Sequence, residues 1–398
     1  MLESKGKLII KDKARKSMHG RHPWVFSGAV NAVSEEIVKG DVVDIIDGRG
    51  GFFGKAFFNP ESQIVARILT FDEIECSLDM IRARLERAIA LRKSLPEYDQ
   101  CTAWRLVYAE ADHLPGLLVD YYSGYVHVQF HSAGWEPVKK DIVAMIAELT
   151  GCIAIFDGSD PEMRHKEGLY TVNETIYGDE PPDNISVVEF GRKFDVDIKK
   201  GQKSGLYLDQ KFNHESILRF ATGRKVLDCF SYTGGFALAA LDCGCDSLTA
   251  VEISEVAVAQ FEINVALNRR GSEPVNVLTG DAFEILREMA DAGERFDMII
   301  LDPPAFCKSK TAVVQACRGY KDINRIAMQL LSPNGILVSC SCSRPVSDEL
   351  FMKVLWQASV EANREAQLLS FAGQSPDHPV LLTFPESKYL KCATLLVQ

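Results

Sequence analysis

The second half of the chain alternates short apolar runs with longer amphipathic segments. A run of about four to eight apolar residues is typical of a buried strand, and helical periodicity is typical of an amphipathic helix. Such alternation predicts an α/β fold built on a doubly wound, mostly parallel sheet. The expected strands are residues 225–229, 247–252, 275–279, 296–302 and 335–340, and the expected helices are residues 236–241, 254–268, 282–289, 323–331 and 347–361, with Pro333 ending the fourth helix.

The first half of the chain has a different pattern. From residue 1 to about 72, short strand-like runs follow one another closely with glycines between them, which predicts a small β-barrel. A helical segment at residues 78–95, several strands, and a second helix near residues 137–149 follow. A Pro-Pro-Asp-Asn cluster at residues 181–184 is typical of a turn. We therefore expect three domains: a small β-domain at residues 1–74, a central α+β domain at residues 75–190 and the α/β domain at residues 191–398.

Composition is that of a globular protein, with 46% hydrophobic and 25% charged residues in a chain of 398. No apolar run reaches membrane-spanning length, and the N-terminus does not have the pattern of a signal peptide. Eleven cysteines without a Cys-x-x-Cys pair favour free thiols in a reducing cytoplasm. The eight histidines show no ligand spacing with Cys or Asp, so we expect no metal.

Charge is distributed unevenly along the chain. The formal net charge is −11, yet residues 1–70 hold 11 Lys or Arg against 8 Asp or Glu, and residues 1–21 hold 7 against 2. A basic face on an acidic protein is compatible with local contact to phosphates. A solvated basic strand would give the same pattern, so charge alone leaves both interpretations open.

A glycine-containing turn follows the first strand of the α/β region. The segment VLDCFSYTGGFALAA lacks Gly-x-Gly-x-x-Gly, so it does not match a dinucleotide fingerprint. Carboxylates instead end three successive strands, and one at the second strand end is placed for a ribose diol. This arrangement suits a cationic nucleoside without phosphates, such as S-adenosylmethionine, although simple helix capping is the alternative. The residues concerned are Asp228, Phe230, Tyr232, Gly234, Glu252 and Asp281.

Reactive groups end the last two predicted parallel strands. Asp302 is followed by the stiff Pro303–Pro304 turn, and its carboxylate could accept from an exocyclic amine, while Phe306 could stack on a planar base. Cys340 and Cys342 alternate along an extended segment, so they should point to opposite sides. Cys342 is the loop-side member and the better nucleophile candidate. By base rate, a single cysteine is more often a small buried hydrophobe.

A thiolate at this edge could attack carbon 6 of a pyrimidine and so activate carbon 5 for methyl transfer. The target base would have to be unpaired or flipped out of its helix, and Phe306, Tyr320 or Tyr207 could stack on it. Cys307, beside the Pro-Pro turn, is a second nucleophile candidate on position alone.

Taken together, these motifs resemble the bacterial 23S ribosomal RNA cytosine-5 methyltransferases of the RlmI type. The resemblance covers essentially the whole chain. It is carried by HGRHPWVFSGAV and GKAFFNPESQIVARIL, which are similar to a PUA-like RNA-binding barrel, and by GQKSGLYLDQKFNH, LDCFSYTGGFALAA, VEIS, GDAFEIL, LDPPAFCKSK, CRGYKDIN and SCSCS in order.

The resemblance implies an α/β methyltransferase domain with a seven-stranded sheet, S-adenosylmethionine as cofactor, and 23S ribosomal RNA or a large-subunit precursor as partner. It implies Cys342 as nucleophile and Asp302 as a second catalytic residue, with Pro303, Pro304 and Phe306 at the substrate. It adds Asp302, Tyr207, Asp209 and Gln210 to the cofactor residues named above. Cys307 does not match a family position and is treated as non-catalytic. The resemblance is compatible with a homodimer.

Three alternatives stay open. A related methyltransferase could act on guanine or uracil, and a guanine enzyme would need no cysteine. A non-catalytic RNA-binding or assembly factor would bind RNA without methyl transfer. A nicotinamide oxidoreductase is disfavoured by the missing glycine fingerprint.

Overall fold

The computed structural model describes residues 2–201, 204–268 and 273–398. The chain divides into two compact units, and each is described by itself. The first contains Met1–Val187, Val196–Leu206 and Pro376–Ser387, and the second contains Val188–Asp195, Tyr207–Ser375 and Lys388–Gln398. The three expected domains divide the chain differently, since Val196–Leu206 and Pro376–Ser387 were expected in the third domain and lie in the first unit, and their boundaries stay a prediction.

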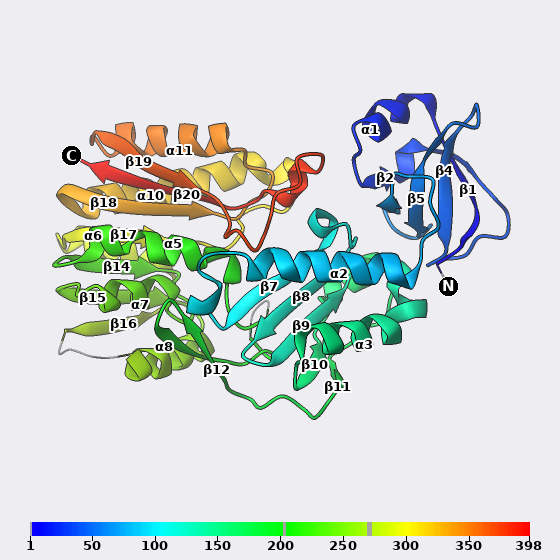
Figure 1. The fold of residues 1–398 in the computed structure, drawn as a ribbon. Coiled ribbons are helices and arrows are strands. Elements are labelled where there is room, and N and C mark those ends of the chain that lie inside the picture. The colour runs from blue at the N-terminus through cyan, green and yellow to red at the C-terminus, as the bar shows by residue number, and fades with distance from the viewer. Residues whose placement is uncertain (1, 202–203, 269–272) are drawn as a thin grey trace. The chain divides into compact units, whose positions relative to one another are not determined.

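The first unit begins with a six-stranded sheet in the order β2-β6-β5-β4-β1-β3 (Figure 1). Leu8, Val43, Ile45 and Ala56 are fully buried in its core, as expected for strands that alternate between two faces. The elements are β1 (Ser4–Ile10), α1 (Arg15–His19), β2 (Trp24–Phe26), β3 (Val30–Val33), β4 (Val42–Asp47), β5 (Phe52–Phe58) and β6 (Ile64–Thr70).

The same unit continues with a five-stranded sheet in the order β11-β10-β9-β8-β7. The first helix of this region starts at the predicted place because the Ser77 side chain accepts a hydrogen bond of 3.1 Å from the Met80 backbone. The elements are α2 (Leu78–Lys93), β7 (Ala103–Tyr108), β8 (Leu117–Tyr122), β9 (Tyr125–Phe130), α3 (Lys139–Thr150), β10 (Ala154–Asp157), α4 (Pro161–Lys166) and β11 (Glu174–Tyr177). A two-stranded hairpin of β12 (Ile185–Glu189) and β13 (Arg192–Val196) follows.

The second unit contains the predicted seven-stranded sheet, in the order β16-β15-β14-β17-β18-β20-β19. The first five strands in that order pair in parallel, and the last two pair antiparallel. The carboxyl ends of the five parallel strands therefore lie along one edge. The strands are β14 (Lys225–Cys229), β15 (Ser247–Glu252), β16 (Val275–Thr279), β17 (Phe296–Leu301), β18 (Leu331–Ser341), β19 (Ala366–Ala372) and β20 (Lys391–Val397).

The helices of this unit largely follow the predicted periodicity. They are α5 (Lys211–Ser216), α6 (Leu218–Ala221), α7 (Gly235–Asp242), α8 (Glu255–Asn268), α9 (Ala282–Asp291), α10 (Val313–Leu330) and α11 (Asp348–Glu361).

One predicted helix, residues 323–331, was wrong in its start and in the residue expected to end it. The helix α10 starts at Val313, because Ala316, Tyr320 and Ile323 already form a buried stripe that Gly319 interrupts in the sequence pattern. It ends at Leu330, where β18 begins, so Pro333 lies within the strand. Pro333 falls where the pairing of β18 with β17 is irregular, which is where a strand tolerates a residue without an N–H.

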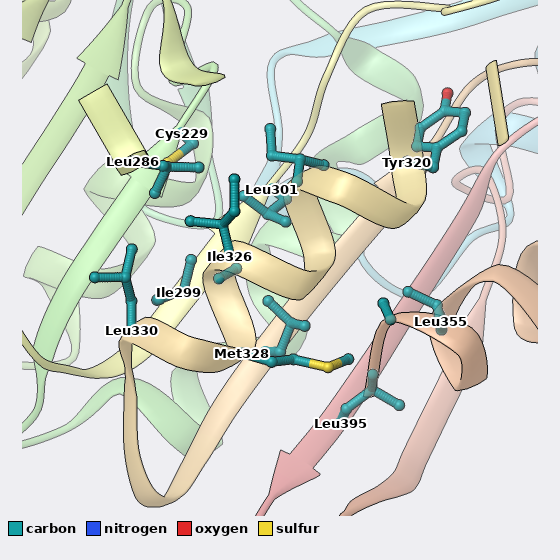
Figure 2. Close-up of a cluster of buried hydrophobic side chains, with 14 of the residues drawn as sticks. Cys229, Leu286, Ile299, Leu301, Tyr320, Ile326, Met328, Leu330, Leu355 and Leu395 are labelled. Atoms are coloured by element: carbon teal, nitrogen blue, oxygen red, sulfur yellow. The ribbon is translucent and has the colours of Figure 1, made fainter. Parts of the chain in front are cut away.

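A large apolar cluster holds β17 and β18, the strands that end just before Asp302 and Cys342. Figure 2 shows Tyr320, Ile326, Met328 and Leu330 of α10 in the same cluster as Ile299 and other buried strand residues. All of these are fully buried. Full burial of each such side chain contributes about 1.5–3 kcal/mol, so the cluster holds β17 and β18 rigidly beside each other.

Candidate active site at the carboxyl edge of the second sheet

Asp228 lies one residue before the end of β14, and it is only 1% exposed. Neither of its carboxylate oxygens has a hydrogen-bond partner among the described side chains and backbone. Burial raises the pKa of Asp228 well above its ordinary value of 3.8, and the nearby carboxylates of Asp302 and Glu252 raise it further, while the backbone N–H of Ala237 acts in the opposite direction. A buried, unsatisfied carboxyl group is costly, and such groups cluster at functional sites.

The turn between β14 and α7 adopts unusual backbone conformations. Phe230 has φ 62°, Tyr232 has φ 48° and Gly234 has φ 99°. Positive φ is uncommon for any residue with a side chain and is an outlier for bulky aromatics, so this turn stores strain that its surroundings must offset. Glu252, at the end of β15, accepts a hydrogen bond of 2.9 Å from the Tyr232 backbone and so helps to hold the turn.

The other carboxylates at this edge also bond backbone groups. The second oxygen of Glu252 accepts from the Ile253 and Ser254 N–H groups, both at 2.9 Å. Asp281 is exposed and accepts from the Phe283 and Glu284 N–H groups at 2.7 and 3.2 Å, as the N-cap of α9. Helix capping is thus a real role of Asp281, and its contact with the cofactor stays a prediction.

The segment before α5 lies at the same site. The ring of Tyr207 packs edge-on against Tyr232, with centroids 5.1 Å apart. Burial raises the pKa of Tyr207, and the charges of Asp302, Tyr232, Asp209 and Cys342 act on it in the same direction, so these groups lie close to it. Asp209 accepts a hydrogen bond from the Tyr389 hydroxyl, and Gln210 accepts one of 2.6 Å from Asn213.

Cys340 and Cys342 have different environments, as their alternation predicts. Cys340 is fully buried, and burial raises its thiol pKa well above 9.0. Cys342 follows the last residue of β18, is partly exposed, and its Sγ lies 3.8 Å from the Pro303 carbonyl oxygen. The thiol of Cys342 therefore lies beside the Asp302–Pro303–Pro304 turn, whereas Cys340 is a packing residue.

The aromatic and cysteine neighbours of this turn differ in accessibility. Tyr320 is fully buried and its hydroxyl pairs with Ser343 Oγ at 2.9 Å, so the expectation that it stacks on a base was wrong. Phe306 is partly buried, with its ring 4.4 Å from that of Tyr320. Cys307 is 4% exposed and its N–H donates to Ser343 Oγ at 3.2 Å.

Sequence reasoning missed several residues around this edge. Lys391 is 2% exposed, and its amine donates to the Ser343 and Val346 carbonyl oxygens at 2.9 and 2.8 Å. The signal was a single lysine inside the apolar run of residues 389–397. His214 pairs with Glu189 at 2.8 Å and lies against Gly235, where a Cβ atom would be 2.3 Å from the ring. No periodic pattern marks either contact.

Membrane-spanning helices and metal clusters are both absent from the described residues. No helix in residues 2–201, 204–268 and 273–398 is long and apolar enough to span a bilayer. Within the same ranges, no group of three or more His, Cys, Asp or Glu side chains is placed to hold a metal ion.

The sheet order, the strained turn and the carboxylate edge define an α/β methyltransferase. Residues 116–388 match the S-adenosylmethionine-dependent methyltransferase family, and residues 8–71 match the PUA-like domain family. The protein is therefore an S-adenosylmethionine-dependent methyltransferase, as predicted, and the prediction of a PUA-like N-terminal domain is confirmed. Its cofactor is S-adenosylmethionine.

Sequence identity to curated proteins shows which methyltransferase family the chain belongs to. A protein of Erwinia tasmaniensis named ribosomal RNA large subunit methyltransferase I is 40% identical over 386 residues, covering 97% of this chain and 98% of the relative. The Escherichia coli protein of the same name is 39% identical over 387 residues, with the same coverage. The chain belongs to the ribosomal RNA large subunit methyltransferase I family.

Solved structures agree on the fold. A putative S-adenosylmethionine-dependent methyltransferase from Streptococcus mutans superposes with a TM-score of 0.84 at 20% identity, over 98% of this chain and 99% of that one. A putative methyltransferase solved in complex with SAH gives 0.85 at 21% identity, with the same coverage. At this identity the likeness concerns the fold alone.

Proposed function

We propose that the protein methylates carbon 5 of a cytidine in 23S ribosomal RNA, with Cys342 as nucleophile. The observation that carries the proposal is the partly exposed thiol of Cys342, 3.8 Å from the Pro303 carbonyl at the end of the parallel sheet. Relatives named ribosomal RNA large subunit methyltransferase I support the ribosomal substrate. The substrate is 23S RNA or a large-subunit precursor, and the enzyme works in the cytoplasm.

The cofactor residues fit a cationic nucleoside without phosphates. The buried Asp228 carboxyl group has two oxygens without partners among the described residues, and Ser231 Oγ is likewise buried without one. Glu252 is partly exposed beside the strained turn. We assign cofactor binding to Asp228, Ser231 and Glu252. We keep the sequence-based prediction that the cofactor also contacts Phe230, Tyr232, Gly234, Asp281, Asp302, Tyr207, Asp209 and Gln210.

In the proposed mechanism, the Cys342 thiolate forms a bond to carbon 6 of the cytosine, and electron density moves to carbon 5. When bound, S-adenosylmethionine would supply the electrophilic methyl group that carbon 5 takes, and its sulfur would keep the electron pair of the broken sulfur–methyl bond. A base then removes the carbon 5 proton. The released pair restores the ring double bond, and the thiolate of Cys342 leaves. We assign to Asp302 the hydrogen bond from the exocyclic amine, and to Pro303, Pro304 and Phe306 the contacts with the base.

Two observations support RNA as the partner. A surface pocket beside α1 is lined by Lys13, Ser17, Met18, Trp24 and Phe26, and Phe26 is 46% exposed. An exposed aromatic ring next to a lysine suits a nucleobase and its phosphate. The cytosine must be unpaired or flipped, since carbon 6 is inaccessible within a stacked duplex.

The test uses tritiated S-adenosylmethionine and unmodified 23S RNA, followed by digestion to nucleosides. We expect label in 5-methylcytidine alone, loss of activity in Cys342→Ala, and retained activity in the matched Cys340→Ala variant. RNA carrying 5-fluorocytidine should form a covalent adduct at Cys342, because fluorine at carbon 5 cannot leave as a proton. Label in a methylated guanine or uracil would contradict the base assignment, and an adduct at Cys307 would contradict the nucleophile.

A homodimer stays a prediction, for which light scattering of the purified protein is the direct measurement. Membership in a methyltransferase family favours the catalytic interpretation over a non-catalytic assembly factor.

A further inference from the structure

Lys391 is an unusual residue for its position. It begins β20, pairs across the sheet with Ser341 at the end of β18, and is 2% exposed. Lysine is almost never fully buried unless it is paired. No carboxylate lies within salt-bridge distance of its amine among the described residues, and its partners are two backbone carbonyls instead.

Those two carbonyls belong to the turn that follows Cys342. The amine donates to Ser343 O at 2.9 Å and to Val346 O at 2.8 Å, so it bridges both ends of the Ser343–Val346 turn. Ser343 is held from its other side by the Tyr320 hydroxyl at 2.9 Å. The residue next to Cys342 is thus fixed by β20 and α10 together, which limits where the Cys342 backbone can move.

The charge of Lys391 lacks a fixed counter-ion. Burial lowers the pKa of Lys391 from 10.5 to about 8, and the nearby charges of Asp348 and Cys342 oppose that change. The ammonium form therefore predominates at pH 7. A buried cation without a carboxylate partner destabilises the folded protein unless another anion nearby compensates its charge. The thiolate of Cys342 is such an anion.

We propose that Lys391 is a positioning residue for Cys342: it holds the turn that carries the nucleophile and keeps a positive charge beside the thiolate. The inference rests on the proposed function, because it gives Cys342 the role of nucleophile. Lys391 itself touches neither substrate nor cofactor in this assignment. Its effect is on the geometry and acidity of the thiol.

Other ionisable groups face the same thiol and Lys391. Burial raises the pKa of Tyr207, and it raises that of Tyr320 to about 12, so neither hydroxyl ionises below pH 9.5. Lys388 lies at the surface and is paired with Asp348. Among the described residues, the charges of Asp348, Lys388 and Cys307 act on Lys391, and the charge of Cys342 acts on Tyr207 and Tyr320.

The test compares Lys391→Met and Lys391→Arg with wild type and with the surface variant Lys353→Met, at an exposed position on α11. Alkylation of Cys342 by iodoacetamide is followed by peptide mass analysis from pH 6 to 9.5, and single-turnover methyl transfer is measured over the same range. Cys342→Ser corrects for labelling of the other thiols. Thermal melting identifies any variant that fails to fold.

An opposite charge nearby shifts a pKa by about 1–3 units, so Lys391→Met should slow Cys342 alkylation at pH 7 by about tenfold or more. The difference should shrink as the pH rises above about 8, because Lys391 itself then loses its positive charge. Lys391→Arg, which keeps the charge, should retain the wild-type pH dependence, and Lys353→Met should behave as wild type. A loss that is equal at every pH would show a merely structural role and overturn the proposal.

The two proposals can fail separately. Alkylation needs neither RNA nor methyl transfer, so a raised thiol pKa in Lys391→Met would support the role of Lys391 on the thiol even if the product were not 5-methylcytidine. Conversely, 5-methylcytidine formation with an unchanged thiol pKa in a folded Lys391→Met variant would support the function and overturn the role of Lys391. If Lys391→Met does not fold, a changed pH profile of Cys342 alkylation in folded Lys391→Arg would overturn the proposed role of the Lys391 charge.

Discussion

At the scale of single residues, Asp228 combines two opposing effects. Its buried carboxyl group costs stability, because neither oxygen has a partner among the described residues. The same group is free to bond a cationic ligand. Asp228 therefore lowers the stability of the cofactor-free protein and strengthens the binding of the cofactor.

We predict that Asp228→Asn raises the melting temperature of the cofactor-free protein and weakens S-adenosylmethionine binding about tenfold or more, since a bond to a charged group contributes about 1.5–3 kcal/mol. The stability effect should depend on pH. The folded pKa of Asp228 lies above its ordinary value of 3.8, so its cost is absent below that value and grows as the pH rises through the folded pKa.

The melting difference between Asp228→Asn and wild type should therefore be small near pH 4 and larger at pH 7. Asp291→Asn, at an exposed position at the end of α9, is the matched control and should show no such trend. Calorimetric titration with S-adenosylmethionine measures the second effect. Equal affinity in Asp228→Asn and wild type would contradict the assignment of Asp228 to the cofactor.

Asp281 caps α9, so the question is whether it also contacts the cofactor. Asp281→Ala should lower stability by about 1 kcal/mol through loss of the bonds to Phe283 and Glu284. Asp281→Asn should keep the cap and the stability. If Asp281 also contacts the cofactor, Asp281→Asn should nevertheless weaken S-adenosylmethionine binding. Unchanged affinity together with unchanged stability would leave Asp281 with capping alone.

At the scale of elements, the start of α7 depends on the absence of a side chain at Gly235. A Cβ atom there would lie 2.3 Å from the His214 ring, which is fixed by its bond to Glu189 and its packing on Phe236. We predict that Gly235→Ala destabilises the protein by about 1–3 kcal/mol and weakens S-adenosylmethionine binding, because the neighbouring turn must shift.

The cause can be isolated with a double-mutant cycle measured by thermal or denaturant unfolding. His214→Ala removes the ring, so Gly235→Ala should cost much less in the His214→Ala background than in wild type. Additive costs would show that the overlap with His214 is not the reason. Gly48→Ala, at a position with no atom within 4 Å of the added Cβ, is the control and should be nearly neutral.

Elements of regular periodicity were predictable from the sequence, and contacts between distant segments were not. The parallel strands and the separation of Cys340 from Cys342 follow from local alternation, which a single sequence displays. The start of α10 was missed because Gly319 masks a helical stripe. Lys391 was missed because it comes close to the turn after Cys342 only through the pairing of β20 with β18. These strands lie about fifty residues apart in the sequence, and no local pattern encodes their pairing.

At the scale of the whole molecule, charge separates the two proposed tasks of the chain. The net charge is −11, yet residues 1–21 carry 7 basic residues against 2 acidic ones. An acidic protein with one basic region contacts RNA through that region and repels it elsewhere, which directs the orientation of binding. Lys13 and Lys16 are exposed in this region, beside the pocket that Trp24 and Phe26 line.

We predict that Lys13→Gln combined with Lys16→Gln weakens RNA binding at low salt. Each phosphate of a single strand that these lysines no longer neutralise should reduce the slope of log affinity against log salt by about 0.7. Filter binding of 23S RNA fragments between about 50 and 300 mM salt measures that slope. The control is Lys93→Gln with Lys140→Gln, which removes the same charge from exposed positions on α2 and α3. Because net charge falls equally in both pairs, a similar weakening in the control would mean that overall charge, and not this basic region, governs RNA binding.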